Sequence, residues 1–277
     1  MTDPTIRYLD LSREELAFTM ERLGIATLVG LEGGPLALIA EEERPAAVAA
    51  GGRALVARGM AQQASGGPDP HWALSQLLIA AVGTCATAAD YMMITQRTPA
   101  LPLFAWYAHL TPGVSVLHTL ADAGVHRFNL CLRPGDLQPM LCAILGCDGQ
   151  PAPAGEPLEV GAEVLDVAAD TAIMEPEAAL NVLRGSGLDD PSAEQMLGTL
   201  RGASASSMVT RARYQDSETR LLDVFGVVST AEGLWLTEPV AGIAGRLTVR
   251  PVAGSELSQR LVSLLDLSGG HADQFTR

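Results

Sequence analysis

Three of the four cysteines stand close together in the stretch HRFNLCLRPGDLQPMLCAILGC, residues 126–147. Thiolates gathered in this way could hold a zinc ion or form a redox pair. Their spacing, C-x10-C-x4-C, matches no standard zinc site. Cys131 alternates with apolar residues on a predicted strand and Cys142 lies on a predicted helix, so both are interpreted as small core residues. The sequence therefore predicts no metal, no redox chemistry and no cofactor at Cys131, Cys142 or Cys147.

Three histidines form the second candidate site. His109, His118 and His126 fall on or beside neighbouring predicted strands, and Asp122 lies near them in the sequence. Imidazoles brought together could bind a metal or transfer protons. Strand and turn histidines without a ligand role are the preferred interpretation. The alternative is an enzyme with a site between two halves of the chain, around His118, Asp122 and His126.

No recognised catalytic motif supports that alternative. The sequence contains no G-x-S-x-G elbow, no Walker loop and no H-E-x-x-H motif. We therefore assign no catalytic, cofactor-binding or metal-binding residue from the sequence.

The elements that must position these side chains begin with a helix over residues 12–23. Ser12 and Glu15 form a capping-box pattern at its start, and Gly24 ends it. The run ATLVGLEGGPLALIA, residues 26–40, has a Gly-Gly-Pro turn between two apolar segments, which predicts a strand or a hairpin.

A second helix is predicted over EEERPAAVAAGGRALVARGM, residues 41–60, with the pair Gly51-Gly52 as a weak point. A meander bounded by helices follows. Its predicted elements are a helix over 72–84, strands over 90–97, 101–110, 114–120 and 125–132, and a helix over 136–145.

The same order of elements recurs after a segment rich in glycine and proline, residues 149–158. The predicted elements of this second run are helices over 175–183 and 192–200, strands over 207–215, 219–228, 234–237 and 245–250, and a helix over 256–265.

A constant offset of 119 residues relates the two runs, and a period this long indicates two copies of one unit. The pairs at this offset are Gly83 with Gly202, Gln96 with Gln215, Arg127 with Arg246, and Gly135 with Gly254. The predicted fold class is α+β, with two similar αββββα-like halves related by pseudo-two-fold symmetry, antiparallel sheets and packed helices. The predicted boundaries are a first half over 1–148, a linker over 149–158, a second half over 159–267 and a loose tail over 268–277, together one compact domain.

The charge of the chain narrows the classes of partner. Its formal net charge is −14, and all 18 basic residues are arginine. An acidic chain repels nucleic-acid phosphates, so nucleic-acid binding is not expected. The most apolar segment, residues 73–89, contains Ser75 and Gln76 and lacks basic flanks, so we expect a buried helix and no membrane span. The N-terminal residues resemble no signal peptide and the cysteines suit a reducing compartment, so a cytoplasmic location is predicted.

Residues 41–60 resemble the early helix of the EspG-type chaperones of type VII (ESX) secretion. The matching positions are Glu43-Arg44, the alanine-rich run 46–50, and Leu55, Arg58, Gly59 and Met60. The segment GVVSTAEGLWLTEPVAGIAGRLTVRPVAGSELSQRLVSLL, residues 226–265, is similar to the C-terminal close of that family, and the internal duplication is similar too.

The resemblance implies a cytosolic binding protein without cofactor, which holds an aggregation-prone helical secretion substrate by an apolar helix tip. It also implies a contact surface on the sheet and on the loop that corresponds here to Gln96, Arg97, Thr98, Pro99 and Ala100. The leading hypothesis is therefore a non-enzymatic chaperone or adaptor with a protein partner. The alternatives are the enzyme described above and a self-associating scaffold, for which a homodimer is the simplest form.

Overall fold

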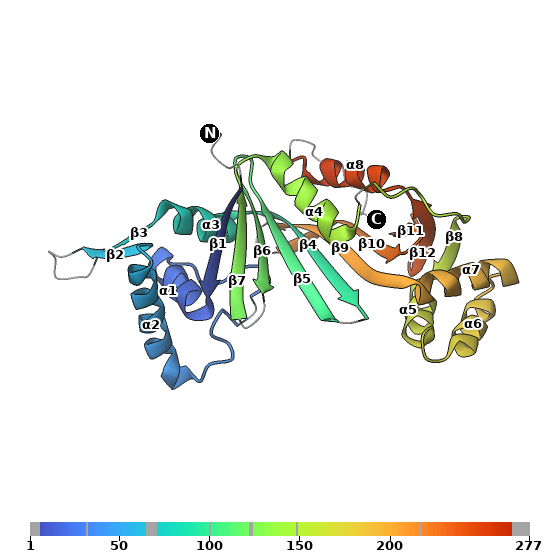
Figure 1. Cartoon of the computed structure of the whole chain (residues 1–277), viewed down its shortest axis with the longest axis horizontal. Coiled ribbons are helices and arrows are strands. Elements are labelled where there is room, and N and C mark those ends of the chain that lie inside the picture. Colours follow the sequence, from blue (N-terminus) through green and yellow to red (C-terminus); the bar gives the residue numbers. More distant parts are fainter. Residues whose placement is uncertain are drawn as a thin grey trace. The chain divides into compact units, whose positions relative to one another are not determined.

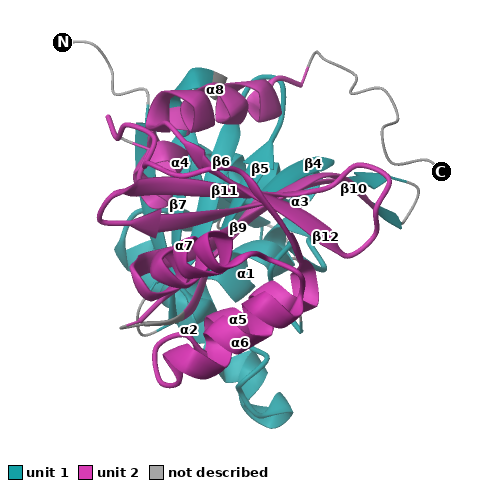
Figure 2. Cartoon of the chain, turned by 90° about the vertical axis from the view of Figure 1, so that its right-hand side faces the viewer, with its two compact units in different colours: residues 1–92, 105–137, 213–219 teal, residues 93–104, 138–212, 220–277 magenta. Residues whose placement is uncertain are grey.

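The computed structural model describes residues 6–31, 33–64, 71–99, 101–121, 124–147, 149–215 and 218–267. The fold is mixed α+β, with a large antiparallel sheet and packed helices, as the sequence predicted. The chain divides into two compact units (Figure 2). Unit 1 comprises residues 1–92, 105–137 and 213–219, and unit 2 comprises residues 93–104, 138–212 and 220–277.

Unit 1 holds the N-terminal strand, three helices and most of a meander (Figure 1). Its helices are α1 (Arg13–Leu23), α2 (Arg44–Ala57) and α3 (Gln76–Thr87). Its strands are β1 (Ile6–Ser12), β2 (Ala61–Ala64), β3 (His71–Leu74), β6 (Ser115–Ala121) and β7 (Val125–Cys131), with parts of β4 (Asp90–Thr98) and β5 (Leu101–Leu110). The strand order is β1-β7-β6-β5-β4, and β2 pairs with β3 in a separate hairpin.

The capping box predicted at the start of α1 is confirmed. The Ser12 hydroxyl accepts a hydrogen bond from the Glu15 backbone N–H, and the Glu15 carboxylate accepts one from the Ser12 N–H. The same carboxylate also binds the Arg58 guanidinium from the end of α2, at 2.8 and 2.9 Å. Glu15 is only 5% exposed, so removing Arg58 would leave a buried charge without its cation.

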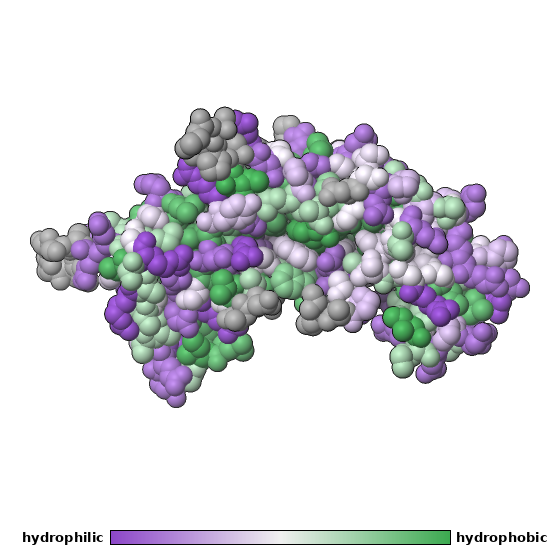
Figure 3. Space-filling model, viewed as in Figure 1, coloured by the Kyte–Doolittle hydropathy of each residue, from purple (hydrophilic) through white to green (hydrophobic). Residues whose placement is uncertain are grey.

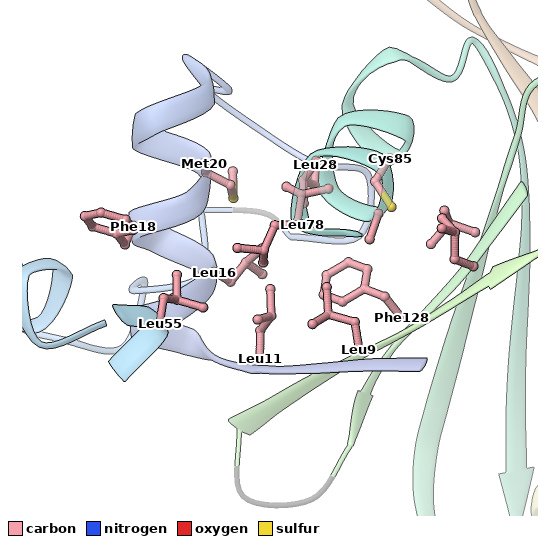
Figure 4. Close-up of a cluster of buried hydrophobic side chains, with 14 of the residues drawn as sticks. Leu9, Leu11, Leu16, Phe18, Met20, Leu28, Leu55, Leu78, Cys85 and Phe128 are labelled. Atoms are coloured by element: carbon pink, nitrogen blue, oxygen red, sulfur yellow. The ribbon is translucent and has the colours of Figure 1, made fainter. Parts of the chain in front are cut away.

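The core of unit 1 forms where β1 and β7 face α1 and α3. Leu9 and Leu11 of β1 and Phe128 of β7 point toward the side chains of both helices (Figure 4). In this cluster Leu16 of α1 and Leu78 of α3 are fully buried. The apolar segment at residues 73–89 is therefore a core element of unit 1, and no described helix is long and apolar enough to cross a membrane.

At Gly51 and Gly52 α2 packs closely against α1, so these glycines have a packing role that the sequence analysis did not predict. A Cβ at Gly51 would collide with the Glu14 carbonyl, and one at Gly52 would collide with the Phe18 ring. Both glycines are buried in the interface between these helices. The missing side chains let the two helices pack, which offsets the low helix propensity of glycine.

Unit 2 contains α4 (Leu137–Leu145), α5 (Ala162–Thr171), α6 (Pro176–Gly185), α7 (Asp190–Arg201) and α8 (Gly254–Leu265); Leu137 belongs to unit 1. Its strands are β8 (Leu158–Gly161), β11 (Gly233–Pro239), β12 (Arg246–Val252) and most of β9 (Ala203–Gln215) and β10 (Glu218–Thr230). Their order is β9-β10-β11-β12-β8.

The two faces of the unit 2 sheet are covered by different helices (Figures 1 and 2). On one face Arg260 of α8 binds Asp223 of β10 and Glu238 of β11, and its guanidinium lies 4.1 Å from the centre of the Phe225 ring. On the other face Trp235 packs against the bundle formed by α5, α6 and α7. Because side chains alternate along a strand, successive residues of these strands contact helices on opposite faces of the sheet.

The meander, both closing helices and the strands of the second run are confirmed within a few residues. The strand or hairpin expected over residues 26–40 was wrong, because the described residues of that segment form turns. Five elements were missed: β1, β2, β3, β8 and α5. Of these, β1 and β8 are edge strands, which pair with β7 and β12.

Taken by itself, each run of sheet strands has the same order, while the β2–β3 hairpin belongs to unit 1. The first strand of each run pairs antiparallel with the last one, β1 with β7 and β8 with β12. The shared order is compatible with an ancestral duplication, which stays a prediction, as do the pseudo-two-fold symmetry and the boundaries 1–148, 149–158 and 159–267. The tail predicted over 268–277 lies outside the described residues.

We expect Gly51→Ala to lower the free energy of unfolding by about 2 kcal/mol or more, because the added methyl group would force α2 away from α1. Gly83→Ala in α3 is the matched control, since a Cβ there meets nothing within 4 Å. It should stabilise the chain by about 0.5–1 kcal/mol through helix propensity. Urea denaturation of both variants measures the difference, and equal effects would contradict the close approach.

Candidate functional groove

Three of the five predicted partner-binding residues line a groove in unit 2. Arg97 and Thr98 at the end of β4 and Pro99 just after it contribute to its wall. Gln96 does not line it: its amide donates hydrogen bonds to the Ile144 carbonyl of α4 at 2.9 Å and to the Ser207 hydroxyl at 3.0 Å. Ala100 lies outside the described residues.

The groove has a volume of about 740 Å³ and lies between α5 and the strands of unit 2. Every residue that lines it belongs to that unit. Its floor is built from small side chains, among them Ala203, Ala205 and Gly226. The space over Gly226 is taken by the Thr237 side chain of the neighbouring strand, with which a Cβ at position 226 would collide.

The rim of the groove is apolar and open to solvent. Leu103 is 61% exposed, Ile173 is 62% exposed and Met208 is 46% exposed. Figure 3 shows hydrophobic atoms gathered over the part of unit 2 that contains α5, bordered by hydrophilic ones. Apolar side chains exposed next to a hollow are typical of a surface that another molecule covers.

One face of α5 forms a whole bank of the groove. Leu165, Asp166, Ala169 and Asp170 line it at the spacing of one helical face, and Ile173 follows just after the helix. Sequence reasoning missed all five residues because it left the segment after 149–158 without a helix. The alternation of Val160, Ala162 and Val164 resembles a strand, but the apolar pattern 164–165–168 that continues it has helical spacing.

An ion pair joins α5 to the end of β4 across the groove. The Arg97 guanidinium lies 3.8 Å from the Asp170 carboxylate, and the two side chains are 70% and 75% exposed. Exposed pairs of this kind contribute about 0 to 1 kcal/mol, so a partner can displace this one at little cost.

The three histidines do come together, in unit 1, but inside its core. His109, His118 and His126 are at most 2% exposed. The Nε2 atom of His118 and the Nδ1 atom of His126 share a hydrogen bond at 3.1 Å, and the His118 ring stacks on Phe128 at 4.5 Å. Both ring nitrogens of His109 lack a hydrogen-bond partner among the described residues.

Burial keeps these imidazoles neutral. Desolvation lowers the pKa of His109 to about 4 and that of His126 to about 4, where the nearby Arg13 adds to the effect. It also lowers the pKa of His118 well below its usual value, with smaller contributions from the two neighbouring histidines. Groups that stay neutral and enclosed at pH 7 are poorly suited to general acid–base work. Asp122, the carboxylate of the enzymatic alternative, lies outside the described residues.

The predicted packing of the cysteines is confirmed. Cys131 at the end of β7 and Cys142 in α4 are buried, as are Cys147 and Cys85. Burial raises the pKa of Cys131 to about 11, with a smaller contribution from Asp136. Within the described ranges no three His, Cys, Asp or Glu side chains are placed to hold a metal ion.

Comparison with known proteins gives the fold a counterpart. No protein-family model matches the chain, and no curated protein matches it. A solved structure of the type VII secretion system chaperone EspG5 of Mycobacterium tuberculosis, in complex with the PE25–PPE41 dimer, is similar over 94% of this chain and 96% of that chain. The TM-score is 0.63 and the sequence identity is 13%.

The fold is EspG-like. The TM-score supports this likeness of the fold. A sequence identity of 13% is too low to support a statement about function. The resemblance seen in residues 41–60 and 226–265 is therefore supported for the architecture.

Acid should destabilise the chain through the buried histidines. Their folded-state pKa values lie below 6.5, so the unfolded chain binds more protons between pH 6.5 and about 4, and stability is lost as the pH falls through that window. We expect His109→Leu to remove about 2 kcal/mol of this loss between pH 7 and pH 4.5. It should also stabilise the chain at pH 7, because it removes two unpaired buried nitrogens.

The control is His71→Gln, at an exposed residue of β3. Its unfolding free energy should follow the wild-type pH profile. The measurement is thermal or urea unfolding at several pH values. A His109→Leu profile parallel to that of the wild type would contradict a neutral buried histidine.

Proposed function

We propose that the chain is a non-enzymatic, cytosolic binding protein of the secretion-chaperone type, which shields an apolar helical end of a secretion substrate. The observation that carries the proposal is the unit 2 groove with its exposed apolar rim. Arg97, Thr98 and Pro99, which the resemblance to EspG-type chaperones singled out, lie on the wall of that groove. Gln96 and Ala100 remain part of the proposed contact segment.

The geometry of the groove suits a helix end better than a small molecule. A small ligand enters a pocket and leaves its rim in water, whereas Leu103, Ile173 and Met208 are apolar and on the rim. A helix tip that inserts one or two large side chains over the small floor residues would cover the rim at the same time. This is the helix-in-groove mode of recognition, in which buried apolar area supplies the affinity.

The solved EspG5 structure supports the same class of partner. EspG5 was determined in complex with a protein dimer, PE25–PPE41. A protein with the same fold and an uncovered apolar groove is therefore expected to have a protein partner too. A stable complex would bury on the order of 1,600 Å² in total, which the groove and its surroundings would have to supply.

Two other hypotheses for the function make different predictions. A second copy of the chain could cover the rim, which would make the protein a self-associating scaffold or a homodimer. Light scattering at increasing concentration separates that case, because a chaperone that waits for its substrate stays monomeric. An enzyme built on His118, Asp122 and His126 would lose its activity in His118→Ala.

The groove should be blocked by Ala169→Trp. Ala169 lines the groove and is exposed, so the indole would fill the hollow without disturbing the core. Val167→Trp is the matched control on the same helix, because Val167 is 48% exposed and lies on a different face of α5.

The measurement is affinity capture from cells of the source, with wild type, Ala169→Trp and Val167→Trp as baits. We expect a helical protein that is retained by the wild type and by Val167→Trp and is reduced at least tenfold with Ala169→Trp. Capture of the same proteins by all three baits would remove the groove from the proposal.

A further inference from the structure

The groove is apolar at its floor and rim, but the bank formed by α5 is negatively charged. Asp166 and Asp170 are four residues apart on the helix, so their carboxylates are neighbours. Like charges at this spacing destabilise a helix by about 0.2–0.5 kcal/mol. The chain therefore carries an unfavourable pair at the place where the groove opens.

The protein itself supplies little to neutralise this pair. Among the described residues, the cation nearest to pairing with Asp170 is Arg97, at a long and exposed contact of 3.8 Å. Within the described part of the chain no cation lies within ion-pair distance of Asp166.

The surrounding bundle adds to the negative field. Between residues 162 and 201 the chain has eight acidic residues, all exposed, and two arginines. One of these arginines, Arg184, is already paired with Asp190 at 2.6 Å and with Glu194 at 3.8 Å. A cation near α5 is attracted by the pair on the bank and by the field of the bundle together.

We infer that the partner's apolar helical end carries arginine or lysine beside its apolar tip, and that these cations lie along Asp166 and Asp170 when the tip enters the groove. The inference rests on the proposed function and adds the charge of the partner to it. The apolar groove supplies most of the affinity, and the two carboxylates select the partner and speed its approach. An acidic or neutral tip of the same shape is discriminated against, because it leaves the α5 pair uncompensated.

The probes are three designed helical hairpins with the same Leu-Phe tip. They differ only in the two residues that flank the tip, which are arginine, glutamine or glutamate. Fluorescence anisotropy with the full chain gives the affinity of each at 50 mM and at 500 mM NaCl. We expect the arginine hairpin to bind at least fivefold more tightly than the glutamine hairpin at low salt, and the glutamate hairpin to bind more weakly than both. At high salt the three affinities should converge, because the Debye length falls to a few ångströms.

Asp166→Asn combined with Asp170→Asn should abolish the preference for the arginine hairpin over the glutamine hairpin. The matched control is Glu177→Gln combined with Glu194→Gln, which removes two charges from the same bundle at residues that do not line the groove. This control should keep most of the preference.

The outcomes separate the two proposals. If the glutamine hairpin binds, Ala169→Trp abolishes that binding and the arginine hairpin shows no gain, the charge inference is overturned and the groove stands. If the Asn and Gln double variants lose the preference equally, the field of the bundle and not the α5 pair is responsible, which also overturns the assignment to Asp166 and Asp170. If no hairpin binds at all, the docking of helical ends fails, and with it both proposals.

Discussion

The constraint on which the groove depends is that both faces of the unit 2 sheet need cover, and one face receives too little. Trp235 and Val249 on that face are buried by α5, α6 and α7, and α8 covers the opposite face. Beside this covered part the bundle leaves a hollow, whose lining includes Ala205, Gly226 and the exposed Met208. One face of α5 therefore lines an open hollow instead of closing a core.

Unit 1 differs from unit 2 in that several of its polar side chains are buried in the core and do not line an open surface. Glu15 is buried but fully used by the cap of α1 and by Arg58. The histidines are enclosed at a cost, since both nitrogens of His109 are unsatisfied among the described residues and their protonation is suppressed by desolvation. A pKa near 4 inside a packed layer of aromatic rings is what burial alone produces, so the perturbation does not by itself point to catalysis.

The sequence predicted an element correctly where a few adjacent residues determine its position. The capping box at Ser12 fixed the start of α1, and the glycine- and proline-marked turns fixed the meander, because both depend on a few adjacent residues. The edge strands β1 and β8 were missed since their place is set by pairing with β7 and β12, which lie more than 80 residues away. The packing role of Gly51 was missed for the same reason: it lets α2 approach the Glu14 carbonyl of α1, which no local pattern reveals.

The groove illustrates that similarity of the backbone does not determine the side chains of a binding surface. Likeness to EspG5 at 13% identity describes the path of the backbone, and an identical path can carry any side chains on the outer face of a helix. Under the proposed function, the residues that would select the partner are therefore side chains that the backbone only positions, above all Asp166, Asp170 and Ala169 on α5. Two proteins with this fold and the same hollow would choose different substrates if one had carboxylates on that bank and the other had none. If the proposed function holds, the hollow would accept a helix end, and the charge on α5 would determine which helix ends bind.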